Sequence, residues 1–415
     1  MIVKNNYDVI IIGGGAAGFF TAINTAEMCP SLKIAILERG KEVLTKVKIS
    51  GGGRCNVTHA EFIPKELSKN YPRGEKELLG PFHSFMTGDT LGWFEERGVA
   101  IKMEEDGRMF PETDSSQTII DCFTSEISRL SIDVLTSHPV KKLSKTENGW
   151  LINTGKEELN ATTVVMATGS NPKIWKLLET LEHRVIPPVP SLFTFNIKDG
   201  RITDLPGVAT EASIKVVGDT KKVILESEGP LLITHWGMSG PAILKLSAWG
   251  ARLLEPLSYS FEIQVNWLLY ETQEDTTEQL LRLKTKNAKQ TLHKYAQFEL
   301  PKRLWQSLLM ASGISETEIW ADISKKKLQN LANQLTQSIF KVEGKSTFKE
   351  EFVTAGGVDL KEVNFKTFES KIHTQLYFAG EVLNIDAITG GFNFQNAWTS
   401  GFMVAKAIEA SLKIS

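Results

Sequence analysis

The chain has 415 residues, of which 41% are hydrophobic and 23% are charged, values that are ordinary for a globular protein of two or three domains. Its 47 basic and 49 acidic residues give a formal net charge of −2, which argues against nucleic acid or an anionic membrane as the main partner. Three cysteines without a Cys-x-x-Cys pair exclude a disulfide framework and a paired-thiol relay.

The N-terminal segment predicts a strand, a glycine-rich turn and a helix. Residues 8–12 (DVIII) are typical of a buried parallel strand, and they lead directly into GGGAAG. This hexapeptide has the G-x-G-x-x-G pattern, in which the glycines permit a tight turn, a close approach of pyrophosphate and close packing of the next helix. We expect the helix over residues 16–28, with the N–H groups of its first turn directed at the phosphates. The predicted contacts come from Gly13, Gly15, Ala16, Ala17 and Gly18.

A second apolar stretch, residues 33–37 (KIAIL), predicts another strand that ends at Glu38, twenty residues after the last glycine of the pattern. At this spacing a carboxylate accepts hydrogen bonds from an adenosine ribose. Arg39 is predicted to stack on adenine or to lie in solvent rather than to bind a 2′-phosphate. The apolar run 9–23 contains four glycines and is shorter than the roughly 20 residues that span a bilayer. We therefore expect a soluble, cytoplasmic protein with no membrane partner.

Residues 46–56 (KVKISGGGRCN) place three consecutive glycines among basic and amide side chains. The stretch has no helical period, so we expect a loop of small residues whose amides approach a ligand longer than adenosine diphosphate. Cys55 is interpreted as a small apolar residue packed under the ligand, with a redox thiol as the alternative. The predicted contacts here come from Lys48, Ser50, Gly51, Gly52, Arg54, Cys55 and Asn56.

Two further segments are predicted to border the same ligand. Residues 134–143 and 150–153 flank Glu147-Asn148-Gly149, a hairpin signal, and Val140 lies where a backbone contact to adenine is expected. Residues 163–168 (TVVMAT) predict a strand whose end crosses beside the cofactor. The contacts expected there come from Ala167, Thr168 and Gly169.

The middle of the chain contains two kinds of sequence pattern, one typical of β-strands and one typical of helices. Short alternating runs separated by turn signals predict a small antiparallel barrel or sandwich. Their ranges are 192–197, 212–217, 222–226, 231–234 and 259–265. Leucines at helical spacing then predict a cap of short helices over 271–340. These leucines are Leu280, Leu283, Leu304, Leu308, Leu328, Leu331 and Leu335. Lys325-Lys326-Lys327 is interpreted as a solvated face rather than a nucleic-acid patch.

The C-terminal segment, residues 376–412, repeats the logic of the N-terminus. An apolar strand is followed by an acid and by Gly390-Gly391, which opens an amphipathic helix that we expect to continue to Leu412. The N–H groups at its start suit the negative charge that a reduced flavin carries on its N1–C2=O edge. The predicted contacts are Gly380, Glu381, Asp386, Gly391, Phe392 and Asn393.

The motifs together resemble the aminoacetone-oxidase-like flavoproteins, a family of NAD(P)/FAD-dependent oxidoreductases that includes flavoproteins implicated in bile-acid metabolism. The matching motifs are IIIGGGAAG with Glu38, SGGGRCN, GRMFP, ATG, THWGMSGPAIL and FAGEVLNIDAITGGFNFQNAWTSG. The resemblance implies non-covalent FAD and an α/β fold, with a Rossmann-like two-dinucleotide-binding-type FAD domain, an inserted antiparallel β-barrel domain and a small helical subdomain. We expect the FAD domain at 1–189 and 355–415, the barrel at 190–270 and 341–354, and the helical subdomain at 271–340.

The chemistry follows less directly from the residues. No Ser–His–Asp pattern and no metal-ligand spacing occurs, so no metal is expected. His235 is a candidate to donate a proton or line the pocket, or else to cap a helix beginning at Gly240-Pro241. Arg108 is a candidate to hold a substrate carboxylate, or else to pair with nearby acids.

Three functions remain open. In the favoured one, NAD(P)H reduces FAD and hydride passes between flavin N5 and a small unsaturated substrate. The absence of a second G-x-G-x-x-G weakens the case for NAD(P)H. In the second, FAD oxidises a small amine and passes electrons to oxygen. The third is a flavin-containing binding or RNA-modification protein, which the near-neutral charge disfavours, and we expect no nucleic-acid partner.

Overall fold

The computed structural model describes residues 5–218, 222–347 and 353–413. The chain divides into two compact units, Met1–Val189 with Val353–Ser415 and Pro190–Phe352. Each unit has a hydrophobic core of its own. Within the described ranges, no helix is long and apolar enough to cross a bilayer.

The main sheet of the first unit is built around β1 (Asn5–Ile12), which pairs in parallel with β2 (Ile34–Leu37) and with β9 (Glu158–Met166). The parallel pairing continues from β2 to β6 (Asp133–Leu135) and from β9 to β21 (Leu376–Phe378). The apolar runs 9–12 of β1 and 34–37 of β2 are buried because helices cover these strands, which explains why neither run is interrupted by a polar residue. The sheet thus joins an N-terminal strand to a C-terminal one through β9.

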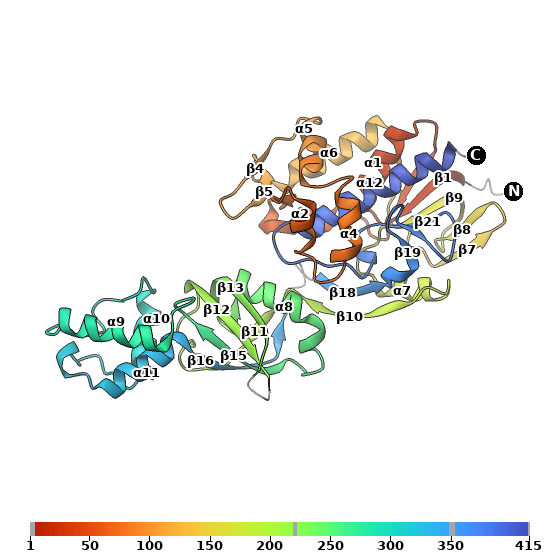
Figure 1. Ribbon diagram of the computed structural model, residues 1–415. Helices are drawn as coiled ribbons and strands as arrows, with labels where there is room; N and C mark the ends of the chain where they lie inside the picture. Colours follow the sequence, from red (N-terminus) through yellow and green to blue (C-terminus); the bar gives the residue numbers. More distant parts are fainter. Residues whose placement is uncertain (1–4, 219–221, 348–352, 414–415) are drawn as a thin grey trace. The chain divides into compact units, whose positions relative to one another are not determined.

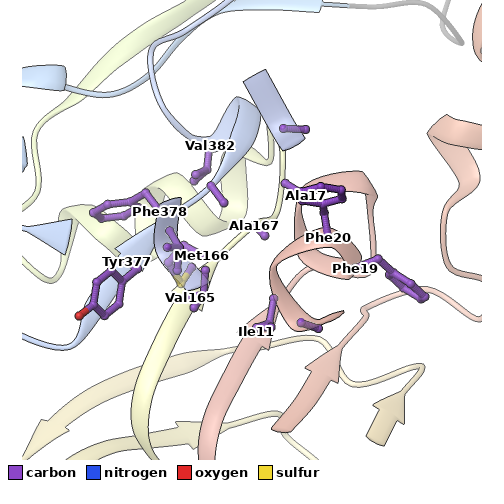
Figure 2. Close-up of a cluster of buried hydrophobic side chains, with 14 of the residues drawn as sticks. Ile11, Ala17, Phe19, Phe20, Val165, Met166, Ala167, Tyr377, Phe378 and Val382 are labelled. Carbon is purple, nitrogen blue, oxygen red and sulfur yellow. The ribbon is translucent and has the colours of Figure 1, made fainter. Parts of the chain in front are cut away.

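Two long helices pack against each other beside this sheet: α1 (Ala16–Met28), with the predicted bounds, and α12 (Phe392–Leu412) (Figure 1). Gly401 makes their close contact possible, because a Cβ there would lie 2.9 Å from Thr21 Oγ1 of α1. Aromatic rings from the two helices also contact each other, and the ring centroids of Phe20 in α1 and Trp398 in α12 are 5.2 Å apart. Figure 2 shows Ala17 of α1 near Ala167, which follows β9, whereas Phe19 lies on the side of the helix away from β9 and β21.

The remaining elements of the first unit surround this framework. The helices are α2 (Thr45–Gly53), α3 (Pro64–Ser68), α4 (Glu75–Phe82), α5 (Thr87–Glu95), α6 (Ser116–Arg129), α7 (Pro172–Glu179), η2 (Leu360–Glu362) and η3 (Gly380–Val382). A small sheet has the order β3 (Thr58–His59), β5 (Arg108–Pro111), β4 (Ile101–Met103). The other strands are β7 (Lys142–Thr146), β8 (Gly149–Asn153), β10 (Val185–Ser191), β18 (Val353–Val358), β19 (Val363–Asn364) and β20 (Glu369–Ser370). The hairpin predicted at Glu147-Asn148-Gly149 connects β7 and β8, but the continuous stretch predicted at 134–143 is split between β6 and β7 by a loop.

The second unit contains an antiparallel sheet with the order β16-β15-β12-β13-β14-β11-β17. Its strands are β11 (Thr194–Asn196), β12 (Ala209–Val217), β13 (Val223–Thr234), β14 (Gly237–Ser239), β15 (Ser260–Asn266), β16 (Ser338–Glu343) and β17 (Lys345–Ser346), and α8 (Pro241–Leu254) follows β14. Because only Gly344 separates β16 from β17, the two ends of the sheet order meet and the sheet closes into a barrel. The separate strands predicted at 222–226 and 231–234 are one long strand, β13, since Gly229 and Pro230 stay paired with β12.

Three helices and a short 3₁₀ turn form the helical part of the second unit. They are α9 (Gln273–Lys286), α10 (Lys302–Ala311), η1 (Trp320–Asp322) and α11 (Lys325–Thr336). Six of the seven leucines predicted to line their inner faces are fully buried, and Leu283 is partly buried. These helices share one continuous core with the barrel, which includes Trp267, Trp305 and Trp320.

Candidate cofactor-binding site

The three glycines of the N-terminal pattern have different surroundings. A Cβ at Gly13, where φ is +121°, would lie 2.3 Å from the carbonyl oxygen of Ala167, and one at Gly18 would lie 1.9 Å from the carbonyl oxygen of Gly13. A Cβ at Gly15, in contrast, would meet no atom within 4 Å. The first and third glycines are therefore required by the packing of β1, β9 and α1. The second borders open space, as a backbone that receives a phosphate must.

No side chain caps the N-terminus of α1, so an anion could bind there without displacing a protein group. Gly15 is the N-cap residue and provides no side-chain cap, and the first turn carries no acidic residue. The N–H groups of Ala16, Ala17 and Gly18 therefore lack intrahelical acceptors, and the positive end of the helix dipole is not neutralised locally. This arrangement fits a diphosphate group.

Glu38 lies at the end of β2 beside the same turn. Its Oε2 accepts a hydrogen bond from the Gly14 N–H at 2.9 Å, and its Oε1 accepts one from the Gly40 N–H at 2.7 Å. These bonds hold the carboxylate beside the glycine turn, and its contact with an adenosine ribose stays a prediction. The Arg39 side chain is exposed.

The segment 137–140 lies beside Glu38. The His138 N–H donates to the Glu38 carbonyl at 2.8 Å, and the Ser137 N–H donates to the Gly40 carbonyl at 2.7 Å. Val140, at the end of this segment, is partly buried and packs on the core. Residues predicted to meet the adenosine end of the ligand, from two distant parts of the chain, are thus neighbours.

The triple-glycine segment differs from its prediction in one respect. Residues Thr45–Ile49, predicted as part of a loop, are the regular part of α2, because burial of Val47 gives this turn a core contact. The helix geometry breaks at Ser50, and Gly51 and Gly52 have φ of +58° and +68°. A Cβ at Gly52 would meet nothing within 4 Å, so its amide borders open space like that of Gly15.

Two polar side chains near these glycines, those of Ser50 and Arg54, contact other groups of the protein. Ser50 Oγ donates to the Val47 carbonyl at 2.8 Å, and the Lys48 side chain is exposed. The guanidinium of Arg54 lies 3.9 Å above the Phe110 ring and 2.6 Å from Glu104. A direct contact between Arg54 and the cofactor therefore stays a prediction that requires this ion pair to be shared or rearranged.

Cys55 is fully buried and has a φ of +61°. Burial raises the pKa of its thiol to about 12. A neutral, inaccessible thiol fits the interpretation of Cys55 as a packing residue and opposes the redox alternative.

This environment predicts that Cys55 does not react with a thiol reagent in the folded protein. Near pH 8 only about one thiol in ten thousand would be the reactive thiolate if its pKa is about 12. The measurement is titration of a Cys29→Ser/Cys122→Ser variant with a chromogenic disulfide, in buffer and in denaturant. Reaction only in denaturant is expected, and prompt reaction of one equivalent in buffer would support the redox alternative.

The C-terminal block meets the triple-glycine segment directly. A Cβ at Gly391, the N-cap of α12, would lie 2.6 Å from the carbonyl group of Thr58 and 2.9 Å from Asn56 Oδ1. The indole N–H of Trp398 donates to the Val57 carbonyl at 2.9 Å. Residues more than 330 positions apart are thus in contact, and the start of α12 lies against the end of the glycine segment.

A second contact joins the C-terminal block to the N-terminal turn. A Cβ at Gly380, where φ is +72°, would lie 3.0 Å from the Cβ of Ala17 in α1. The next residue, Glu381, pairs with Lys46 at 2.9 Å, and this attraction raises the pKa of Lys46. A Cβ at Gly169 would lie 3.7 Å from the Glu381 carboxylate. The predicted contacts after β9, after β21 and in α1 therefore gather at the carboxyl ends of the parallel strands, where α/β sheets bind ligands.

The loop before α12 is braced from within. Asp386 is fully buried and forms an ion pair with Arg73. Asn393 Oδ1 accepts from the Ala387 N–H at 3.0 Å, and Tyr71 Oη donates to the Phe392 carbonyl at 2.6 Å. Asp386, Phe392 and Asn393 thus hold the helix start in place, and their direct contact with a ligand stays a prediction.

Three buried amides of this region were missed in the sequence. Gln395 Oε1 accepts from Thr58 Oγ1 at 2.6 Å and from Thr90 Oγ1 at 3.0 Å, which ties α12 to β3 and α5. Within the described part of the chain, Asn384 Oδ1 and both side-chain polar atoms of Asn396 are buried without a hydrogen-bond partner. Such atoms need a partner, so they are candidates to contact the cofactor. For Gln395 and Asn396 the available signal was the presence of amides within the apolar run FNFQNAW, a run that does not include Asn384.

The two predicted catalytic residues have separate surroundings. Arg108 pairs with Asp106 at 2.7 Å and with Glu104 at 3.1 Å, which is the alternative considered for it. His235 belongs to the second unit, in the turn between β13 and β14, and its side chain is exposed. It does not cap α8, whose N-cap Gly240 has no side-chain partner. It lines a cavity of about 320 Å³ together with Lys198, Thr203 and Thr234.

Open glycine amides, an uncapped helix start and orphaned buried amides converge at one end of a parallel sheet, and they fit FAD, so the first unit is a Rossmann-type FAD-binding domain. The chain belongs to the family described as HI0933-like protein Rossmann domain, which matches residues 7–407. It is accordingly a member of a family of FAD-dependent oxidoreductases.

Individual relatives are similar over nearly the whole length. A ribosomal RNA dihydrouridine synthase of Haemophilus influenzae is 29% identical and covers 96% of this chain and 98% of the relative. A 3-dehydro-bile acid delta(4,6)-reductase of Clostridium scindens is 26% identical, with coverage of 96% and 98%. The crystal structure of a 3-ketosteroid-delta4-(5alpha)-dehydrogenase of Rhodococcus jostii has a TM-score of 0.52 at 11% identity and covers 98% of both chains, a likeness that shows the fold alone.

Proposed function

We propose that this protein is an FAD-dependent reductase that adds hydrogen across a carbon–carbon double bond conjugated to a carbonyl group, with NAD(P)H as the electron donor. The single observation that carries the proposal is chemical. Dihydrouridine is uridine with one such ring bond saturated, and a delta(4,6)-reductase of a 3-dehydro-bile acid saturates bonds of the same kind. Two relatives with different substrates therefore share one reaction type.

The residues of the first unit would hold FAD along its length. Glu38 would accept hydrogen bonds from the ribose, and the N–H groups that follow Gly15 would bind the diphosphate. The amides of Gly51 and Gly52 and the start of α12 at Gly391 would face the more distal part. When bound, FAD supplies the hydride that reduces the substrate.

The chain must also position the substrate and deliver a proton. His235 is a candidate proton donor, because its exposed imidazole lines a cavity with the polar side chains of Lys198 and Thr234. Arg108 is a weaker candidate for a substrate carboxylate, because Glu104 and Asp106 already pair with its guanidinium. We therefore assign the proton to His235 and treat Arg108 as a residue whose ion pairs a carboxylate would have to replace.

The test is anaerobic stopped-flow measurement of the visible flavin absorbance. We expect NADH or NADPH to bleach the FAD and small amines to leave it unchanged. A 3-oxo-Δ4 bile acid and a uridine-containing RNA, added separately to the reduced enzyme, then test which acceptor restores the colour. Bleaching by an amine alone would overturn the proposal in favour of the amine oxidase. The His235→Gln variant should keep the bleaching by NAD(P)H and slow the reoxidation by the organic acceptor.

A further inference from the structure

One segment of the second unit carries a local excess of positive charge. Residues 282–303 contain seven basic residues and a single acidic one, Glu299, within a chain whose formal net charge is −2. All seven belong to the helical part, at the end of α9, in the segment after it and at the start of α10. The net charge of the whole chain does not reveal this local excess of basic residues. The expectation of no nucleic-acid partner was based on that net charge.

The tertiary structure adds two lysines from a later helix. The Ala321 N–H donates to the Ala288 carbonyl at 2.9 Å, and the Trp320 N–H donates to the Gln290 carbonyl at 2.9 Å. Lys284 Nζ donates to the Ile323 carbonyl at 2.5 Å. These bonds place the first turn of α11 beside the end of α9. The resulting surface, here named the basic face, consists of Lys286, Lys289, Lys294, Lys325 and Lys326, all of them exposed.

The lysines of the basic face are not neutralised by the protein. Among the described residues, no carboxylate lies within 4.0 Å of any of these five ammonium groups, whereas the neighbouring Arg282 and Lys327 pair with Glu278 and Glu318. Two exposed acidic residues lie in the same neighbourhood, namely Asp322 and Glu316, which lines a cavity together with Lys294. Three positive charges would remain if each of these acids neutralised one lysine, so the face attracts an anion of several charges.

The position of Lys325 and Lys326 is unfavourable for the helix itself. Both lie in the first turn of α11, where the positive end of the helix dipole repels cations, and no acidic residue occupies that turn. A local rule broken without a compensating carboxylate is typical of a functional surface. Glu318 pairs with Lys327 in this turn, whereas no ion pair of Lys325 or Lys326 occurs among the described residues, so these two lysines are available to an anionic ligand.

An aromatic ring and a hollow adjoin the basic face. The Tyr295 side chain is 56% exposed, and the ammonium of Lys294 lies 5.1 Å from its ring centroid. A cavity of about 450 Å³ beside it is lined by Thr291, His293, Lys294, Gln306, Ser307, Met310 and Glu316. Basic side chains that follow a phosphate backbone, next to an exposed ring on which a base stacks, are the elements of single-strand binding.

We infer that the basic face with Tyr295 binds single-stranded RNA. The inference rests on the proposed function and deepens it, because it places the reduced carbon–carbon double bond in a uridine of RNA. The relative named a ribosomal RNA dihydrouridine synthase aligns with 96% of this chain, so the alignment extends into the helical part that carries this face. An acidic protein would satisfy the lysines but leave no role for the exposed ring beside them.

The test measures binding of a fluorescently labelled, uridine-containing single-stranded RNA of about 16 nucleotides to the FAD-loaded protein. Fluorescence anisotropy of the RNA reports the binding. The variant carries Lys286→Glu, Lys289→Glu, Lys325→Glu and Lys326→Glu. We expect its affinity to fall at least about tenfold and the slope of log K against log salt to decrease by about 2 to 3. Tyr295→Ala should weaken binding about fivefold or more through lost stacking.

The matched control is Lys173→Glu/Lys176→Glu on α7 of the first unit, two exposed lysines outside the basic face, which should leave the affinity unchanged. Flavin content and bleaching by NAD(P)H should be the same in the basic-face variant and the wild type. If NAD(P)H bleaches neither the wild type nor the basic-face variant, while the variant still binds RNA more weakly, the proposed function is wrong and the RNA-binding role of the basic face is supported. Equal RNA binding by the variant and the wild type would overturn the inference, as would a polyglutamate peptide that displaces the RNA at equal charge concentration.

Discussion

Replacing Gly15 by valine is expected to yield a folded protein that has lost its flavin. A Cβ at this position meets no atom within 4 Å, and the residue has an extended backbone with φ of −99°. Valine therefore fits the protein without strain. Its side chain would occupy the space before the first turn of α1, where the diphosphate must approach the free N–H groups.

The neighbouring glycines provide the contrast. Gly13→Val and Gly18→Val place side chains 2.3 Å and 1.9 Å from carbonyl oxygens, so these variants should fail to fold or lose most of their stability. Gly88→Val, a substitution at an open position in α5, should keep the flavin. The measurements are the flavin-to-protein absorbance ratio and the far-UV circular dichroism. A yellow Gly15→Val protein would disprove the placement of the diphosphate.

Replacing Arg73 by methionine is expected to destabilise the first unit by about 3–5 kcal/mol. Asp386 is 0% exposed, and Arg73 is the cation paired with it. Loss of the guanidinium removes the positive charge that pairs with this buried carboxylate, and removing one partner of a buried pair costs far more than the intact pair contributes. The loop that Asp386 anchors leads to Gly391, so weaker FAD binding should accompany the loss of stability.

Two variants separate this explanation from a general effect of losing an arginine. Arg73→Met/Asp386→Leu removes both charges and should recover most of the stability, since an apolar replacement of a buried pair is often neutral. Arg184→Met breaks the pair of Arg184 with Asp359, in which Arg184 is 70% exposed, and should cost at most about 1 kcal/mol. Urea unfolding followed by tryptophan fluorescence measures all three. A loss below about 1 kcal/mol for Arg73→Met would contradict the burial argument.

Errors in the sequence-based assignment of elements have local causes. The stretch 231–234 is separated from 222–226 in the sequence by Gly229-Pro230, a pair that favours a turn. In the structure Ala212 and Glu211 of β12 pair with these two residues and keep β13 continuous. Similarly, Thr45–Ile49 becomes helical because Val47 reaches the core, which no property of the glycine-rich segment indicates. In both cases a partner distant in sequence outweighs a local preference.

The sequence by itself determined the first βαβ unit of this protein. Gly13, Gly15, Gly18 and Glu38 lie within one short stretch, and their spacing encodes turn, helix start and acid through local geometry alone. The same holds for the start of α1, which the glycine turn specifies.

Only the tertiary structure decided which distant segments complete the site. The pairs Thr58–Gly391, Lys46–Glu381 and Arg73–Asp386 join residues separated by more than 300 positions. Local patterns describe what one segment prefers, and they contain no information about which other segment will satisfy its charges or fill its open side. That choice is made by the pairing of β9 with both β1 and β21, which brings the two ends of the chain to one edge of a sheet.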